Sequence, residues 1–172
     1  YHNSQKRISN QLGDGRLLSQ LTKKDLIFNF RQNDIQNGGE GAPLTPIFHQ
    51  LIATKYKIDL PTCILNIGGI SNITIIGKPT GKYGFTSRDI GPGNCLIDSW
   101  MRKNSKYKYD KDGILASSGK RNDIIVEQAQ ELFANRANQS TLSFDTSDFD
   151  VSFARGLSLE DGAATLTDFT AR

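Results

Sequence analysis

Two strongly apolar segments with a glycine pair between them limit what the middle of this chain can fold into. Residues 63–67 and 70–76 are rich in isoleucine, and Gly68 and Gly69 lie between them. β-Branched residues favour strands, and two glycines between such runs are typical of a β-hairpin turn. The sequence therefore predicts a hairpin over residues 63–76.

The same glycine pair supports a second interpretation. Glycine lets a backbone approach a ligand closely, and its N–H groups can hold phosphate oxygens. Asn66, Ser71 and Asn72 are polar side chains within an otherwise apolar run. The glycines alone favour a plain hairpin turn, whereas the polar neighbours favour a ligand site, and both interpretations stay open here.

Strands alternate with helices along the rest of the sequence, which indicates an α/β or α+β protein. Asp14 and Ser158 are expected to cap the first and last helices, with Asp161 as the capping-box partner of Ser158. A boundary between two parts is expected near residues 58–61. Spacing predicts helices over 16–21, 47–53, 95–101, 123–133 and from 159 onward, and strands over 7–12, 25–30 and 150–153.

A polar, glycine-rich loop is predicted over residues 31–43. Loops of this length are uncommon in compact domains and often functional. Asp34 would follow a strand end beside Gly39 and Gly41, where a carboxylate could act as a general base. The alternative is a solvated turn aspartate, which is the commoner fate of a single Asp.

A second polar segment, residues 88–94, opens directly onto the helix predicted from Cys95. Backbone N–H groups at a helix start favour anions. Asp89 would suit a magnesium ion or its waters better than a phosphate. The alternative is a loop in which Pro92 and Gly93 only set the turn.

Composition excludes several classes of protein. The chain has 172 residues, 37% of them hydrophobic and 23% charged, which is not a disorder signature. The net charge of +3 is scattered, so we expect no nucleic-acid partner. No segment suits a membrane span.

Cys63 and Cys95 lie apart in apolar runs, so we expect buried free thiols in the cytoplasm. Residues 110–113 are similar to the start of a calcium-binding loop, but Ile114 occupies the position of the third ligand, so no metal-ligand cluster is expected.

Residues 29–44, 66–74 and 89–94 closely resemble segments of the anhydro-N-acetylmuramic acid kinase family. Residues 11–15, 109–113 and 157–167 are similar to further segments of that family, in the same order. The resemblance implies part of an actin-like, ribonuclease H-like ATPase fold, with two α/β lobes and nucleotide between them. It implies that residues 1–58 form the end of the first lobe and contain the sugar-binding loop. Residues 59–172 would form the start of the second lobe and contain the phosphate-binding turns.

The resemblance also implies a reaction. ATP and Mg2+ would serve a kinase that opens the 1,6-anhydro ring of the amino sugar with water and phosphorylates O6, in peptidoglycan recycling. Asp34 would be the general base, and Arg31, Gly39 and Gly41 would lie on the sugar side. A homodimer is implied too. The phosphate and nucleotide residues would be Asn66, Gly68, Gly69, Asn72, Asp89, Gly91, Gly93 and Asn94.

Several features predict an internal fragment of such an enzyme. The chain begins at Tyr1 without a methionine, and the family's Gly-Thr-Ser phosphate loop and His-Gly-Gln segment do not occur in it. Ser140–Ser143 stand where the family has Pro-Pro-Lys-Ser. We therefore expect little or no kinase activity from this chain alone. The alternative is a non-catalytic remnant that keeps only partial ligand or partner binding.

Overall fold

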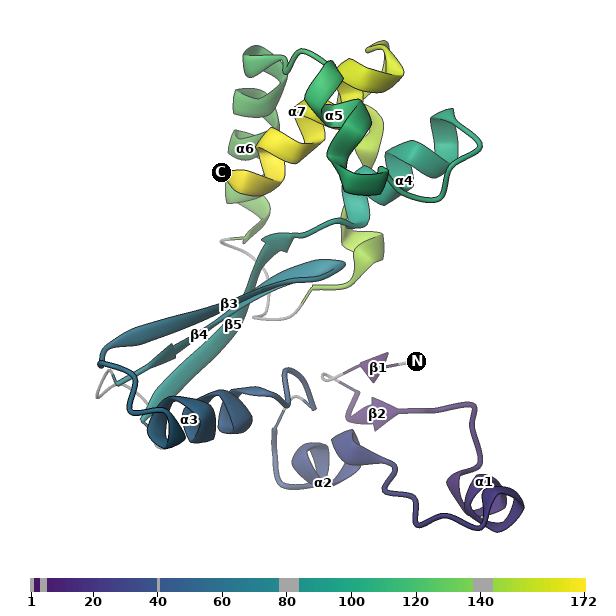
Figure 1. Ribbon diagram of the computed structural model, residues 1–172, viewed down its shortest axis with the longest axis vertical. Coiled ribbons are helices and arrows are strands. Elements are labelled where there is room, and N and C mark those ends of the chain that lie inside the picture. Colours follow the sequence, from purple (N-terminus) through teal and green to yellow (C-terminus); the bar gives the residue numbers. More distant parts are fainter. Residues whose placement is uncertain (1, 4–5, 40, 78–83, 138–143) are drawn as a thin grey trace. The chain divides into compact units, whose positions relative to one another are not determined.

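The computed structural model describes residues 2–3, 6–39, 41–77, 84–137 and 144–172. Helices are combined with antiparallel sheets, so the chain is of mixed α/β composition (Figure 1). The chain divides into two compact units, Tyr1–Asp59 and Leu60–Arg172, and each is described by itself. Within the described residues, no helix has both the length and the apolarity to cross a membrane.

The first unit contains a small two-stranded sheet and three helices. Asp14 caps the first helix as predicted, because its carboxylate accepts the N–H groups of Arg16 and Leu17 at 2.9 and 3.1 Å. The strand expected over 7–12 is only two residues long. The elements are β1 (His2–Asn3), paired antiparallel with β2 (Ile8–Ser9), then α1 (Gly15–Thr22), α2 (Phe30–Gln36) and α3 (Pro46–Lys55).

Two predictions for the first unit are wrong. Residues 25–29 form no strand, and the first part of the predicted loop is helix α2. Asn29 adopts a left-handed conformation with φ of 65°, which ends the extended run before α2 begins. Helix α2 then buries Ile35, whose side chain is 1% exposed. A short apolar run without a clear period does not distinguish strand from coil, and here burial of Ile35 favours the helix.

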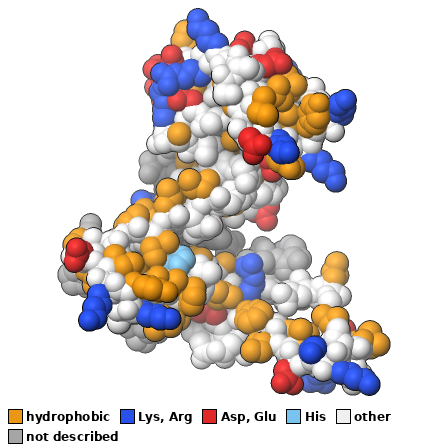
Figure 2. Space-filling view, viewed as in Figure 1, with side chains coloured by type: hydrophobic (Ala, Val, Ile, Leu, Met, Phe, Trp, Pro, Cys, Tyr) orange, Lys and Arg blue, Asp and Glu red, His pale blue; other side chains and the backbone are white. Residues whose placement is uncertain are grey.

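Many apolar side chains of the first unit face solvent. Figure 2 shows apolar side chains gathered over this part of the chain. Among its described residues the buried apolar side chains are those of Ile35, Pro46 and Ala53. Exposed large side chains include Leu17, Leu21, Ile47, Phe48 and Leu51.

The second unit begins with a three-stranded antiparallel sheet in the order β3-β4-β5. The predicted hairpin is confirmed, with Gly68 and Gly69 joining β3 (Thr62–Ile67) to β4 (Ile70–Ile76). The predicted loop over 88–94 is wrong up to Pro92, because these residues belong to strand β5 (Phe85–Pro92). Pairing with β4 supplies hydrogen-bond partners to this polar segment and makes it a strand.

The remaining elements of the second unit pack into the main core. Leu96, Trp100, Met101, Val126 and Leu166 are among its buried side chains. The predicted helices over 95–101 and 123–133 are confirmed. The elements are α4 (Cys95–Asn104), η1 (Lys111–Gly113), α5 (Ile114–Ser118), α6 (Asp123–Ala137), η2 (Thr146–Asp148), η3 (Val151–Ala154) and α7 (Leu159–Ala171).

The strand predicted over 150–153 is wrong. Val151 and Ala154 are both buried, three residues apart, and this spacing fits the 3-10 helix η3 rather than the alternation of a strand. The cap of α7 is confirmed, because the Ser158 hydroxyl accepts the N–H of Asp161 at 3.1 Å. The Asp161 carboxylate, however, accepts the N–H of Lys120 at 2.7 Å, so its role differs from the expected capping-box partner.

Both cysteines are free thiols, but burial was predicted wrongly for Cys63. Cys63 is exposed on β3, which lies at the edge of the sheet. Cys95 is half-buried, and this burial raises the pKa of its thiol. Within the described ranges, no three His, Cys, Asp or Glu side chains are grouped as metal ligands would be. Ser140–Ser143 and most of the turn expected over 77–84 lie outside the described residues.

Candidate functional site

Helix α2 and the glycine-rich segment after it hold the Asp34 carboxylate in a defined position. The backbone N–H of Gly41 donates to Oδ2 of Asp34 at 2.7 Å. The N–H of Gly39 donates to the Asp34 carbonyl oxygen at 2.8 Å. These two bonds fold the segment back over the end of α2, so that one carboxylate oxygen is fixed by an amide while the side chain stays exposed.

The close approach requires glycine. A Cβ atom at position 39 would run into the carboxylate of Asp34. Gly41 is buried and has a φ of 72°, a conformation that side chains rarely adopt. Arg31 lies three residues before Asp34 on α2, and its Nη1 donates to the Gly41 carbonyl at 3.3 Å. Arg31, Asp34, Gly39 and Gly41 are thus brought together in the first unit.

This arrangement is chemically suited to proton transfer. A carboxylate that is oriented by an amide and open to solvent can accept a proton from a bound water or hydroxyl. The nearby guanidinium of Arg31 offers several N–H donors for a polar ligand. The first unit therefore presents an acceptor and a set of donors within one short segment.

In the second unit the two glycine segments lie against each other. The N–H groups of Gly93 and Asn94 donate to the carbonyls of Gly69 and Gly68 at 2.9 and 2.8 Å, and Cys95 donates to Gly69 at 3.2 Å. A Cβ on Gly93 would run into the Gly68 carbonyl oxygen. These three N–H groups at the start of α4 were expected to face an anion, and they bind the hairpin instead.

Polar side chains line neighbouring strands beside the glycine hairpin. Asn66 on β3 lies opposite Asn72 on β4, and Asn72 lies opposite Asp89 on β5. Oδ2 of Asp89 accepts the N–H of Phe144 at 2.9 Å. Burial raises the pKa of the Asp89 carboxyl, and the bond from Phe144 opposes that change. Cross-strand partners are close neighbours, so these residues form one polar row across the sheet.

Two hollows of the second unit lie near residues 91–94, one beside strand β5 and one at the start of α4. One of about 430 Å³ is lined by Ser71, Gly91, Pro92 and Thr170 together with apolar side chains of β3, α6 and α7. The other, of about 770 Å³, includes Asn94 and, from the segments packed beside it, Asp98, Tyr109, Asp110 and Arg121. The first hollow therefore leaves open space for a ligand beside Gly91 and Pro92.

Sequence reasoning missed two residues that hold this site, Thr170 and Phe144, and it missed the partner of Ser71. The Ser71 hydroxyl donates to the Pro92 carbonyl at 3.4 Å, and the Thr170 hydroxyl donates to the Gly93 carbonyl at 2.9 Å. Phe144 supplies the amide that binds Asp89. Thr170 and Gly93 are 77 residues apart, and no local pattern indicates that they meet. The site between two lobes that the resemblance implies remains a prediction, because Asp34 and the glycine turns belong to different units.

Comparison with known proteins places these segments in a family. A family model described as anhydro-N-acetylmuramic acid kinase matches residues 1–172. The anhydro-N-acetylmuramic acid kinase of Pelagibacter ubique is 53% identical over 171 residues, which cover 99% of this chain and 45% of the relative. The protein of that name from Zymomonas mobilis is 41% identical over 94% of this chain and 43% of its own length. The one from Gluconobacter oxydans is 38% identical over 98% and 47%.

The chain spans less than half the length of these relatives. The match nevertheless includes both units and every segment that forms the two clusters described above. This chain belongs to the anhydro-N-acetylmuramic acid kinase family.

Proposed function

We propose that the protein carrying this chain is an ATP-dependent kinase of 1,6-anhydro-N-acetylmuramic acid. It opens the anhydro ring with water and phosphorylates O6 to give N-acetylmuramic acid 6-phosphate, a step of peptidoglycan recycling in the cytoplasm. The observation that carries the proposal is the Asp34 carboxylate, held by the Gly41 amide at 2.7 Å and open to solvent. Family membership supports the choice of substrate.

In this proposal Asp34 is the general base. Its carboxylate takes a proton from the water whose oxygen bonds to C1 of the sugar, while the bond from C1 to the bridging oxygen O6 breaks. O6 takes the γ-phosphoryl group of ATP, ADP leaves, and the proton on Asp34 passes to solvent. The amide of Gly41 orients the carboxylate for that transfer. Arg31 donates hydrogen bonds to the sugar, with Gly39 and Gly41 forming the backbone wall beside it.

The second unit holds the nucleotide in this proposal. Gly68 and Gly69, with Asn66 and Asn72 on the flanking strands, lie on the phosphate side. Gly91, Gly93 and Asn94 form the opposite wall of the nucleotide site. The fold is then part of an actin-like ATPase, with residues 1–58 from the first lobe and 59–172 from the second, and a homodimer is the expected assembly.

Asp89 is the residue that fits a magnesium ion of MgATP. Mg2+ in kinases is held by one or two carboxylates together with phosphate oxygens and waters, so a group of three side-chain ligands is not needed. Asp89 lies beside Asn72 in the polar row near the glycine hairpin and keeps one carboxylate oxygen that does not bind Phe144. Bound Mg2+ would neutralise charge on the phosphates.

The decisive experiment is a coupled assay of ADP release with 1,6-anhydro-N-acetylmuramic acid and MgATP. We expect Asp34→Asn to lower kcat by about 100-fold or more, because the base is lost, with little change in the affinity for MgATP. Asp25→Asn is the matched control, since Asp25 is an exposed aspartate of the same unit. Full turnover by Asp34→Asn would overturn the assignment. The assay uses the whole protein that carries this chain, and failure of that unchanged protein to bind MgATP or turn over the sugar would favour the non-catalytic remnant.

A further inference from the structure

We propose that Thr170, on helix α7, is a positioning residue that fixes the direction of the peptide group between Gly93 and Asn94. The inference rests on the proposed function, in which this glycine segment borders the nucleotide. Its starting observation is the bond from the Thr170 hydroxyl to the Gly93 carbonyl, 2.9 Å long and partly buried.

A peptide group is planar, so its carbonyl and its N–H point in opposite directions and turn together. The peptide group of Gly93 and Asn94 is held at both ends. Its carbonyl accepts from Thr170 at 2.9 Å, and its N–H donates to the Gly68 carbonyl at 2.8 Å. Without Thr170 only the N–H end would be fixed.

The preceding peptide group is held in the same manner. The Pro92 carbonyl accepts from the Ser71 hydroxyl at 3.4 Å, and the Gly93 N–H donates to Gly69 at 2.9 Å. Ser71 belongs to β4, so the sheet itself supplies this second hydroxyl. Thr170 is the contact that comes from outside the sheet.

The hydrogen bond that the Thr170 hydroxyl donates is unusual for a threonine in a helix. Helical threonines often bond the carbonyl four residues earlier. Thr165 and Thr167 do so on the same helix, donating to Asp161 at 2.6 Å and Ala163 at 2.8 Å. Thr170 donates instead to a residue 77 positions away. Its hydroxyl therefore serves a tertiary contact.

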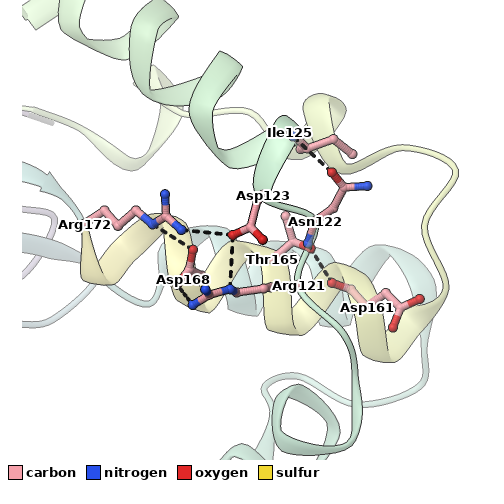
Figure 3. Close-up of polar contacts among 8 residues, drawn as sticks. All are labelled: Arg121, Asn122, Asp123, Ile125, Asp161, Thr165, Asp168 and Arg172. Carbon is pink, nitrogen blue, oxygen red and sulfur yellow. Dashed lines mark hydrogen bonds and ion pairs between the residues drawn. The ribbon is translucent and has the colours of Figure 1, made fainter.

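The end of α7 that carries Thr170 is fixed by a ring of alternating charges (Figure 3). Asp168 and Arg172, two residues to either side of Thr170, form an ion pair at 2.9 Å. Exposed ion pairs contribute little one at a time, but a closed ring with one partly buried carboxylate restrains geometry better. The other ring contacts are Arg121–Asp168, Arg121–Asp123 and Arg172–Asp123, each 3.1 Å long.

The test compares Thr170→Val, which removes the hydroxyl at nearly constant shape, with Thr170→Ser, which keeps it. Thr167→Val is the matched control, because Thr167 is exposed on the same helix and bonds only within it among the contacts described. Two quantities are measured on the whole protein: hydrogen exchange of the Asn94 amide, and the dissociation constant of MgATP by calorimetry.

We expect Thr170→Val to speed exchange of the Asn94 amide and to weaken MgATP binding, each by about fivefold, the effect of one lost hydrogen bond. The midpoint of thermal unfolding should change no more than in Thr167→Val, and Thr170→Ser should restore both measurements. If Thr170→Val does not fold, Thr170→Ala takes its place.

Wild-type exchange and wild-type affinity in Thr170→Val would overturn the inference. So would equal losses in Thr170→Val and Thr167→Val, because those would reflect the stability of α7 alone. If the unchanged protein binds no MgATP while the Asn94 amide still exchanges faster in Thr170→Val, the positioning role stands and the proposed function fails.

Discussion

The N–H of Gly41 donates to the carboxylate of Asp34 at 2.7 Å, seven residues back along the chain. The bond closes the glycine-rich segment over the end of α2 and leaves the Asp34 side chain exposed. Position and accessibility, the two properties that a general base needs, thus come from one short stretch of sequence. The glycines of this stretch can be tested directly.

Gly39→Ala should disable the Asp34 carboxylate without unfolding the protein. The added Cβ would occupy the space of that carboxylate, which must swing away from the Gly41 amide. We expect kcat in the ADP-release assay to fall by about tenfold or more, as for a misplaced catalytic group. Gly13→Ala is the control, because its Cβ would meet no atom within 4 Å. Equal activity of the two variants would contradict the prediction.

Gly93→Ala should destabilise the second unit. Its Cβ would run into the Gly68 carbonyl, a backbone atom that is itself bound by Asn94 and cannot shift cheaply. Overpacking of this kind costs about 2 kcal/mol. Denaturant unfolding followed by the fluorescence of Trp100, the single tryptophan, measures the change.

Gly69→Ala is the matched control for Gly93→Ala. The nearest atom to its added Cβ would be Cγ2 of Thr146 at 3.6 Å, which is ordinary contact. We expect the free energy of unfolding to change by less than about 0.5 kcal/mol, as at a site without a clash. A larger loss in Gly69→Ala than in Gly93→Ala would show that the close contact between the turns is not what stabilises them.

Asp89 and Asp145 should change stability with pH in opposite directions. Burial raises the pKa of Asp89 above its ordinary 3.8. The contribution of Asp89 to folding stability is therefore fully present below the unfolded-state pKa and is lost as pH rises through the pKa of the folded state. Hydrogen bonds from Ser147 lower the pKa of Asp145 below its ordinary 3.8. The contribution of Asp145 to folding stability is therefore fully present above the unfolded-state pKa and is lost as pH falls through the pKa of the folded state.

Thermal midpoints between about pH 3 and about pH 7 check these signs. With rising pH, Asp89→Asn should gain stability relative to the unchanged protein, while Asp145→Asn should lose it. Each variant is the control for the other, because both replace a carboxylate of the second unit by an amide. The same sign for both would contradict the assignment of burial to Asp89 and of hydrogen bonding to Asp145.

The parts of the fold that were predictable are those decided by neighbouring residues. The hairpin around Gly68 and Gly69 follows from dense β-branched residues on both sides of a turn. The caps at Asp14 and Ser158 act within three residues. The region around Asp34 was also predictable as a cluster, because its partners lie within ten residues.

What sequence reasoning missed depends on distant contacts. Helix α2 forms where burial of Ile35 and the left-handed Asn29 outweigh an apolar run that was interpreted as a strand. The bond between Phe144 and Asp89 spans 55 residues. Periodicity and turn signals predict single helices, strands and turns. They do not predict which distant residues meet, because that depends on how the elements pack together.

Gly162→Ala is expected to destabilise the protein although alanine is the better helix former. Alanine gains about 1 kcal/mol over glycine within a helix. At position 162 its Cβ would run into the indole of Trp100, which is 4% exposed and donates from Nε1 to the Leu159 carbonyl at 2.9 Å. The ring cannot move without losing that bond, so the clash, at about 1–3 kcal/mol, outweighs the gain.

A double-mutant cycle with Trp100→Phe separates the two effects, because the smaller ring should relieve the clash. We expect Gly162→Ala to lower the unfolding free energy in the Trp100 background and to lower it less, or raise it, in the Phe background. Circular dichroism follows unfolding in both, since fluorescence is lost with Trp100. Equal effects of Gly162→Ala in the two backgrounds would mean that the indole yields freely, and that α4 and α7 are not in rigid contact at this point.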